Sequence, residues 1–160
     1  MKVIRILLFT GIFFLSSCII ERYEIKTPDY LIFGHFYGEC MGEGCIEIFK
    51  IQDELLYEDE NDTYPTSTNV YNAKWKVLDK VKYEEVKNLT DFFPEKLLQE
   101  NKRIIGQPDA GDWGGIYIEI KTGDSHKLWL IDKMRSNVPE AYHEFLNKVE
   151  EKINLLQNIQ

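Results

Sequence analysis

The spacing of hydrophobic and polar residues changes along the chain, and over residues 30–58 it predicts strands. Residues 30–37 are rich in aromatic and β-branched side chains, which favour strands. Successive positions there are apolar, so we expect a central strand covered on both faces. A second strand is expected at 45–51, antiparallel to the first, and a short third one at 54–58.

The middle of the chain alternates between polar and periodic segments. Residues 58–69 are polar and should form a loop, and residues 70–78 alternate enough to predict another strand. From 79 to 93 the apolar residues recur every three or four positions, which predicts a helix that ends before Pro94. A further helical turn is expected at 95–100.

The last third predicts a hairpin followed by a long helix. Residues 106–115 are rich in glycine and should form a loop, and isoleucines alternate with polar residues at 116–121, as in a half-buried strand. Residues 127–132 would pair with it across a turn at 122–125.

A closing helix is predicted at 137–158, with Asn137 as its cap and Pro139 in its first turn. Its apolar stripe consists of Tyr142, Phe145, Leu146, Val149, Ile153 and Leu156. The element order predicts an α+β fold, an antiparallel sheet of about 4–6 strands with two helices packed on one face. The chain shows no internal repeat.

The first residues of the chain form a separate segment. Lys2 and Arg5 precede an apolar run that is shorter than the roughly 20 residues needed to span a bilayer. The run ends at Leu15-Ser16-Ser17-Cys18, which resembles the lipobox of bacterial lipoproteins. An uncleaved helix and an ordinary secretory signal are the alternatives.

The lipobox resemblance implies cleavage before Cys18 and a lipid on its sulfur. Residues 1–17 would be the signal peptide, 18–29 a tether and 30–158 a single domain. The lipid would hold the protein at the membrane of the bacterial cell envelope, since two or three acyl chains bind far more firmly than one. Ile19 follows the cysteine instead of an aspartate, which favours the outer membrane over the inner one.

Charge narrows the range of partners. The chain has a formal net charge of −8, which becomes −10 once Lys2 and Arg5 leave with the signal peptide. Phosphate groups would repel such a surface, so nucleic acid is not an expected partner. The acidic run Glu54, Glu58, Asp59, Glu60 and Asp62 is either a solvated loop or a surface for a basic protein partner.

Cys40 and Cys45 remain once Cys18 is lipidated. An even pair in an exported chain predicts a disulfide, and the glycines between them allow a tight loop. As a redox-active pair, these cysteines would lack the usual C-x-x-C spacing and a neighbouring Lys or His that lowers the pKa of a thiol. A zinc site would need a second pair of ligands.

The cysteine–glycine loop, the hairpin at 116–132 and the closing helix together resemble a small domain of unknown function found in exported bacterial proteins. That resemblance covers roughly residues 30–153 and implies no activity.

Asp109, Asp112 and Trp113 lie in the glycine-rich loop and are the candidate binding residues. They would bind a sugar or a cation, or the two carboxylates would act as acid and base in a carbohydrate-active hydrolase. Aspartate and glycine are also typical of plain turns.

Catalytic motifs are lacking, and no cofactor or metal is expected. His35 is expected to be packed in a strand, and His126 and His143 to lie at the surface. The sequence therefore favours a lipid-anchored binding or interaction domain without enzymatic activity, such as an immunity or inhibitor protein. A hydrolase using Asp109 and Asp112 and a structural envelope lipoprotein are the alternatives.

Overall fold

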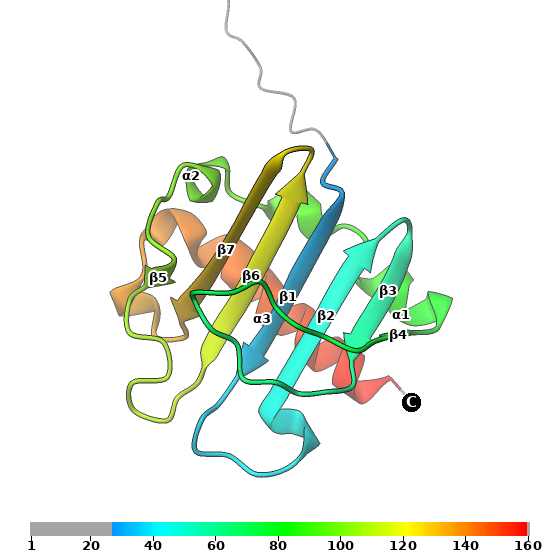
Figure 1. Ribbon diagram of the computed structural model, residues 1–160, viewed down its shortest axis with the longest axis horizontal. Helices are drawn as coiled ribbons and strands as arrows, with labels where there is room; N and C mark the ends of the chain where they lie inside the picture. The colour runs from blue at the N-terminus through cyan, green and yellow to red at the C-terminus, as the bar shows by residue number, and fades with distance from the viewer. Residues whose placement is uncertain (1–26, 160) are drawn as a thin grey trace, which may run out of the picture.

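The computed structural model describes residues 27–159. The expected signal peptide, Cys18 and most of the expected tether lie outside these residues. The described chain forms a mixed α+β fold around one sheet (Figure 1). The α+β class is confirmed, but the sheet has seven strands instead of the expected 4–6.

The strands run in the order β4-β3-β2-β1-β6-β7-β5 across the sheet. Their bounds are β1 Tyr30–Phe36, β2 Ile46–Gln52, β3 Leu55–Asp59, β4 Trp75–Val77, β5 Ile104–Ile105, β6 Gly115–Thr122 and β7 Ser125–Asp132. All neighbours are antiparallel except β5 and β7. The central strand is β1, as its apolar sequence predicts: Phe33 pairs with Phe49 on one side and with Ile118 on the other.

The helices are α1 Lys80–Val86, α2 Glu95–Leu98 and α3 His143–Asn158, and four short 3₁₀ segments separate other elements: η1 Glu43–Cys45, η2 Leu89–Phe92, η3 Arg135–Asn137 and η4 Glu140–Tyr142. The whole predicted apolar stripe of α3 is buried. No helix in the region 27–159 is long and apolar enough to cross a bilayer.

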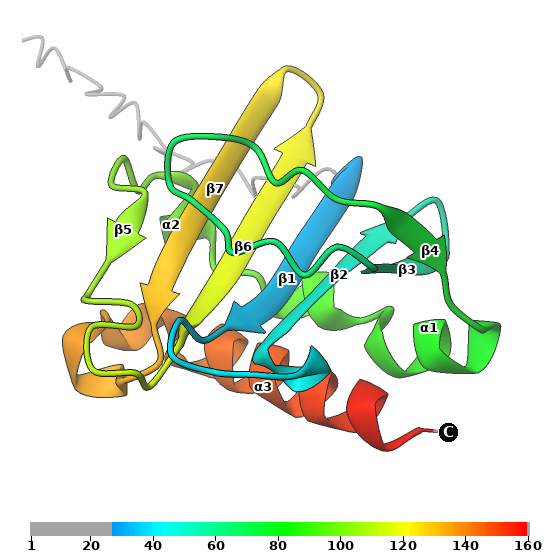
Figure 2. The same cartoon turned by 60° about the horizontal axis from the view of Figure 1, so that its bottom comes forward.

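Each face of the sheet has its own apolar cluster. The larger cluster joins one face to buried residues of α1, η2, α2 and α3. The smaller cluster lies on the opposite face and includes Phe36, Ile48, Tyr71 and Tyr117. A segment without helix or strand, residues 60–74, crosses this second face, and we call it the strap (Figure 2).

The strap explains two differences from the predicted elements. Residues 70–78 contribute only the short strand β4, because 70–74 belong to the strap. The strand β6 is not half-buried as expected: Tyr117 and Glu119, on its supposedly solvent-facing side, are buried on the strap face. A short strand that was not predicted, β5, pairs with Leu130 and Ile131 of β7.

Two helix predictions are wrong in their bounds. The helix expected at 79–93 ends at Val86 and is followed by η2; Phe93 is extended, as the residue before a proline usually is. The closing helix begins at His143 instead of 137. Val138, which precedes Pro139, is also extended, and the Asn137 side chain donates to Asp132 at 2.7 Å instead of capping the helix.

Candidate functional site

Several loops meet at one end of the sheet, where β1 and β7 end and β2 and β6 begin. We define the loop end as residues 37–45, 106–114 and 133–137 together with Tyr64 of the strap. In Figure 1 it lies along the lower edge of the sheet. Functional residues are often found on loops that a rigid sheet positions, so the loop end is the candidate site.

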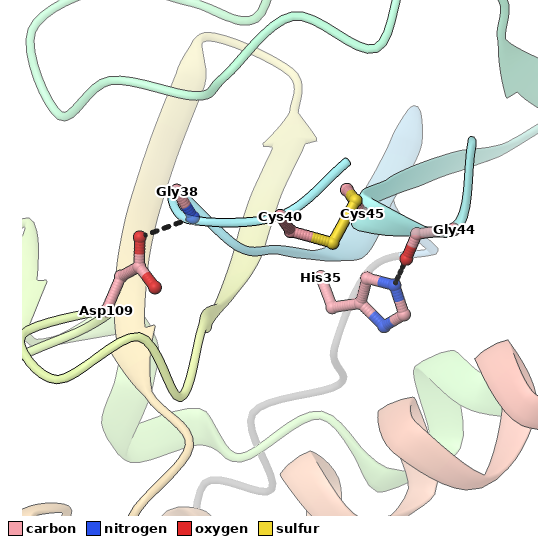
Figure 3. Close-up of a disulfide and its surroundings, with 6 residues drawn as sticks. All are labelled: His35, Gly38, Cys40, Gly44, Cys45 and Asp109. Atoms are coloured by element: carbon pink, nitrogen blue, oxygen red, sulfur yellow. Dashed lines mark hydrogen bonds between the residues drawn. A yellow bond between two sulfur atoms is a disulfide. The ribbon is translucent and has the colours of Figure 1, made fainter. Parts of the chain in front are cut away.

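A disulfide closes the first of these loops. Cys40 and Cys45 are bonded, with their Cα atoms 5.6 Å apart, as the sequence predicts (Figure 3). The Tyr37 N–H donates to the Cys45 carbonyl at 3.0 Å, and the Cys45 N–H donates to the Gly42 carbonyl at 3.2 Å. Met41 lies within the closed ring and its side chain is 98% exposed. The covalent ring therefore presents a large apolar side chain to solvent.

One carboxylate, Asp109, joins three segments of the loop end. Its Oδ2 accepts a hydrogen bond from the Gly38 N–H at 2.7 Å (Figure 3). The same oxygen also accepts from the Tyr64 hydroxyl at 2.8 Å. Its Oδ1 accepts from the Gly114 N–H at 3.0 Å. Both carboxylate oxygens are thus occupied by groups of the chain itself. Asp109 acts as a brace between the disulfide loop, the strap and its own loop.

The candidate binding residues of that loop have different roles in the structure. Asp109 and Asp112 both adopt positive φ, 62° and 60°, and the Asp112 N–H donates to the Asp109 carbonyl at 3.4 Å. This is the local geometry of a turn. Trp113 remains 53% exposed. Neither aspartate lines any of the four pockets that we describe within residues 27–159. The arrangement suits a brace beside an exposed aromatic ring better than an acid–base pair.

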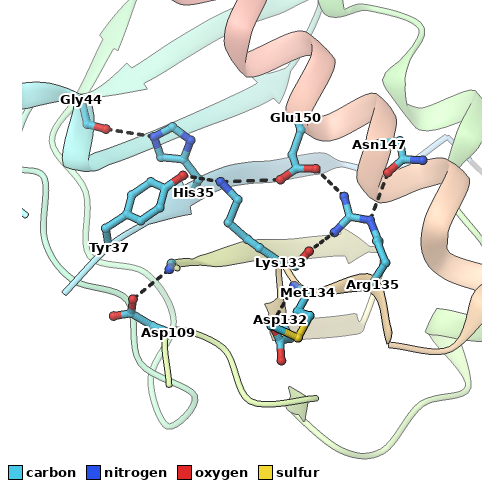
Figure 4. A network of polar contacts seen from close by, with 11 residues as sticks. His35, Tyr37, Gly44, Asp109, Asp132, Lys133, Met134, Arg135, Asn147 and Glu150 are labelled. Atoms are coloured by element: carbon cyan, nitrogen blue, oxygen red, sulfur yellow. Dashed lines mark hydrogen bonds and ion pairs between the residues drawn. The ribbon is translucent and has the colours of Figure 1, made fainter. Parts of the chain in front are cut away.

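A second carboxylate, the buried Asp132, fixes the segment that follows β7. It accepts from the N–H groups of Gln107 and Met134 at 2.9 and 2.8 Å, in addition to the bond from Asn137. Met134 is exposed between Lys133 and Arg135, beside the rest of the loop end (Figure 4).

A polar network connects the loop end to α3. The Lys133 ammonium donates to the Tyr37 hydroxyl and lies 3.6 Å from Glu150 Oε1, and Arg135 binds the other oxygen of Glu150 (Figure 4). His35 contacts the Gly44 carbonyl through Nε2 at 3.1 Å and is buried, as predicted. Burial is the main cause that lowers the pKa of His35, and the nearby Lys133 adds to it.

The network borders a pocket of about 460 Å³ between the disulfide loop and α3. Its lining consists of His35, Tyr37, Gly44, Lys133, Glu150, Asn154 and Gln157. These groups can donate and accept hydrogen bonds, but the lining holds no serine, threonine or free cysteine beside the imidazole. The pocket therefore has the chemistry of a polar contact surface, and its lining does not include a Ser–His or Cys–His pair.

Four of the five residues of the predicted acidic surface, Glu58, Asp59, Glu60 and Asp62, lie together around one pocket, and Glu54 lies apart from them. Asp59 is buried and binds the strap through the Asn61 and Lys74 N–H groups and the Tyr71 hydroxyl. Glu60 forms ion pairs with Lys74 and Lys76. The pocket has a volume of about 530 Å³, and its lining also includes Glu47, Lys74 and Lys76. Glu54 lies at the turn between β2 and β3, away from the loop end.

Sequence reasoning missed Lys133, Arg135 and above all Glu119. The alternation of its strand predicts that Glu119 faces solvent, yet it is 0% exposed and its Oε1 lies 2.8 Å from His126 Nε2. Only the overlying strap could have revealed this. Considering His, Cys, Asp and Glu alone, no three side chains within 27–159 gather as metal ligands.

No protein-family model matches the chain, and no curated protein matches it either.

Proposed function

We propose that this protein is a lipid-anchored, non-enzymatic interaction domain of the bacterial cell envelope, and that the loop end is its protein-binding surface. The lipobox supports a lipid anchor at Cys18. Ile19 follows the cysteine instead of an aspartate, which supports the outer membrane as the location. In this proposal α1 and α3 form a two-helix layer on one face of the sheet and leave the loop end free for a partner.

The observation that carries the proposal is the bracing of three exposed side chains. Met41, Trp113 and Tyr64 come from separate segments, and Asp109 hydrogen-bonds to the segment of each of them. Tyr64 is 42% exposed even though its hydroxyl is bound. Met, Trp and Tyr are enriched in protein interfaces. Because the loops are already ordered, a partner would lose little conformational entropy in binding them.

The chemistry of the partner follows from charge. Glu39 and Asp112 are exposed beside the apolar side chains, and the whole chain is acidic. A basic protein would be attracted to this surface and would bind more weakly at high salt. A basic exported toxin or hydrolase, blocked by an anchored immunity or inhibitor protein, fits this description.

The anchor is tested on the protein isolated from its own membrane. Intact-mass measurement should find residues 1–17 removed and acyl mass added at Cys18. A Cys18→Ala variant should lose the acyl mass and leave the membrane fraction. An intact initiator methionine and an unmodified Cys18 thiol would exclude the anchor.

The binding surface is tested by capturing partners from envelope extracts with the full-length chain in detergent. We expect a basic protein whose capture falls at least tenfold in Met41→Ala and in Trp113→Ala, since both remove apolar contact area. Val81→Ala is the matched control, because Val81 is an exposed apolar residue of α1 outside the loop end. Equal losses in all three variants, or no captured protein at low salt, would favour a structural envelope lipoprotein instead.

A further inference from the structure

A second cluster of reactive side chains lies at the opposite end of the sheet from the loop end. Tyr30 begins β1, His126 stands near the start of β7, and Glu119 lies in β6 between these strands. The backbone register brings the three residues together: Tyr30 and His126 both pair with Lys121 of β6, and Glu119 pairs with Ile32 of β1. Their side chains meet on the strap face of the sheet.

The three polar atoms form a closed triangle. Tyr30 Oη lies 2.8 Å from Glu119 Oε1, His126 Nε2 lies 2.8 Å from the same oxygen, and Tyr30 Oη lies 3.1 Å from His126 Nε2. With the carboxylate ionised, the phenol and the imidazole bring only two hydrogens to these three contacts. One side of the triangle is therefore left without a hydrogen of its own. A cation bound to all three atoms would satisfy every side.

The second oxygen of Glu119 is held separately. Glu119 Oε2 accepts hydrogen bonds from the Tyr117 hydroxyl and, at 3.3 Å, from the Tyr71 N–H of the strap. These contacts orient the buried carboxylate so that Oε1 faces Tyr30 and His126. Partners of this kind commonly fix the orientation of metal ligands. The His126 side chain is 32% exposed, so an ion can reach the cluster from solvent.

We infer that Tyr30 Oη, Glu119 Oε1 and His126 Nε2 form a binding site for a ferric ion. Two ligand atoms at adjacent positions of an ion with bonds of about 2.0–2.1 Å lie about 2.9 Å apart, which is close to the spacing of this triangle. Water would complete the coordination on the exposed side. This site is independent of the proposed protein-binding surface.

The choice of ion follows from the ligands. Phenolate and carboxylate are hard oxygen donors, which suit a small, highly charged cation, and imidazole also binds iron. Zinc is bound by thiolate, imidazole and carboxylate groups, and calcium and magnesium by oxygen alone, so none of these ions typically combines a phenolate with an imidazole. A phenolate, a carboxylate and an imidazole together therefore favour ferric iron.

Binding changes the protonation of two groups. Burial, together with the carboxylates of Glu119 and Asp29, raises the pKa of Tyr30, so the phenol keeps its proton without a cation. A trivalent ion reverses this preference: the O–H bond breaks, an O–Fe bond forms and the proton passes to solvent. His126 binds as the neutral tautomer with its hydrogen on Nδ1.

The test uses the metal-free, full-length chain in detergent, titrated with ferric nitrilotriacetate near neutral pH. We expect a visible tyrosinate-to-iron charge-transfer band that saturates at one iron per chain. Tyr30→Phe should abolish the band, and His126→Ala should lower ferric affinity at least tenfold. Tyr117→Phe should weaken binding but keep the band, because Tyr117 contacts only the other oxygen of Glu119.

Tyr57→Phe serves as the matched control, since Tyr57 lies on β3 and not in this cluster, and it should leave the band unchanged. Circular dichroism checks that each variant is folded. Absence of the band in the folded wild-type chain would overturn the site, and so would a band that persists in Tyr30→Phe. Stabilisation by zinc without any binding of ferric ion would overturn the choice of metal.

Discussion

Asp109 illustrates how one side chain can shape a surface without facing a ligand. It has the positive φ that aspartate tolerates better than most residues, and its two oxygens accept three hydrogen bonds from separate segments. Gly114, one of its donors, also has positive φ, and a side chain there would collide with the Tyr37 ring. The loop end therefore depends on a few positions with strict backbone and hydrogen-bond requirements.

Asp109→Asn should destabilise the fold by about 1–3 kcal/mol. The amide keeps one acceptor oxygen but turns an NH₂ group toward donors that the carboxylate had satisfied. Urea unfolding of the full-length chain measures the change. Asp112→Asn is the matched control, because it makes the same chemical change at a neighbouring exposed residue with positive φ. A loss for Asp112→Asn as large as that for Asp109→Asn would contradict the brace.

At the scale of elements, the strap is the feature that most alters the sheet. It has no helix or strand of its own and is held by side chains: Tyr71 packs on the sheet and binds Asp59, and Arg103 donates to the Ser67 and Thr68 carbonyls. By covering the second face it converts an ordinary antiparallel sheet into one that is buried on both sides.

The strap should loosen when Asp59 is changed. Asp59 is 4% exposed and accepts three hydrogen bonds from residues of the strap. Asp59→Asn would leave some of these donors without an acceptor. We expect faster hydrogen exchange in residues 60–74 while β1 and β6 stay protected. Glu60→Gln, which removes only exposed ion pairs, should leave that exchange pattern unchanged. Uniform acceleration over the whole sheet would argue against a local role for Asp59.

The disulfide loop is an element whose order depends on one covalent bond. Replacing both Cys40 and Cys45 by serine should cost about 2 kcal/mol, as expected for closing a short loop. The main effect should be local, with higher mobility of Met41 seen by NMR relaxation of its methyl group. An unchanged Met41 signal would show that the hydrogen bonds of Tyr37 and Cys45 order the loop without the disulfide.

At the scale of the whole molecule, four tyrosines bound to carboxylates make the fold sensitive to alkali. Burial is the main cause that raises the pKa of Tyr30, Tyr71 and Tyr117, and the charges and hydrogen bonds of Glu119 and Asp59 add to it. Burial, together with Asp109, raises the pKa of Tyr64 to about 12. Below about pH 10, the usual pKa of tyrosine, both the folded and the unfolded chains keep these protons. Above it the unfolded chain releases protons that the folded chain retains, so stability falls as pH rises.

The urea midpoint should therefore fall steeply between about pH 10 and about pH 11, and tyrosinate absorbance from these residues should appear only with unfolding. Tyr117→Phe should make the decline shallower, because it removes one retained proton. Tyr57→Phe is the control variant, since no hydrogen bond joins Tyr57 to a carboxylate within residues 27–159. A midpoint that is independent of pH in this range would contradict the assignment of buried, protonated tyrosines.

Local patterns predicted much of the architecture. The apolar run of β1, the alternation of β6 and the stripe of α3 each reflect the spacing of side chains within one element, so they could be read from neighbouring residues. The Cys40–Cys45 pair was predictable for the same reason, because its partners are close in the chain. Asp109, Asp112 and Trp113 were identified as a loop group, although the bracing role of Asp109 was not.

The sequence alone determined the α+β class, the central strand and the disulfide, since these depend on local period and short chain separation. Only the tertiary structure decided which polar residues meet. Glu119 looked solvent-facing by alternation, but Tyr30, Tyr71 and His126 enclose it from three other segments. The start of α3 and the bonds of Asp109 likewise depend on distant groups. Contacts between segments far apart in the chain leave no periodic signal, because chain packing, not residue spacing, brings them together.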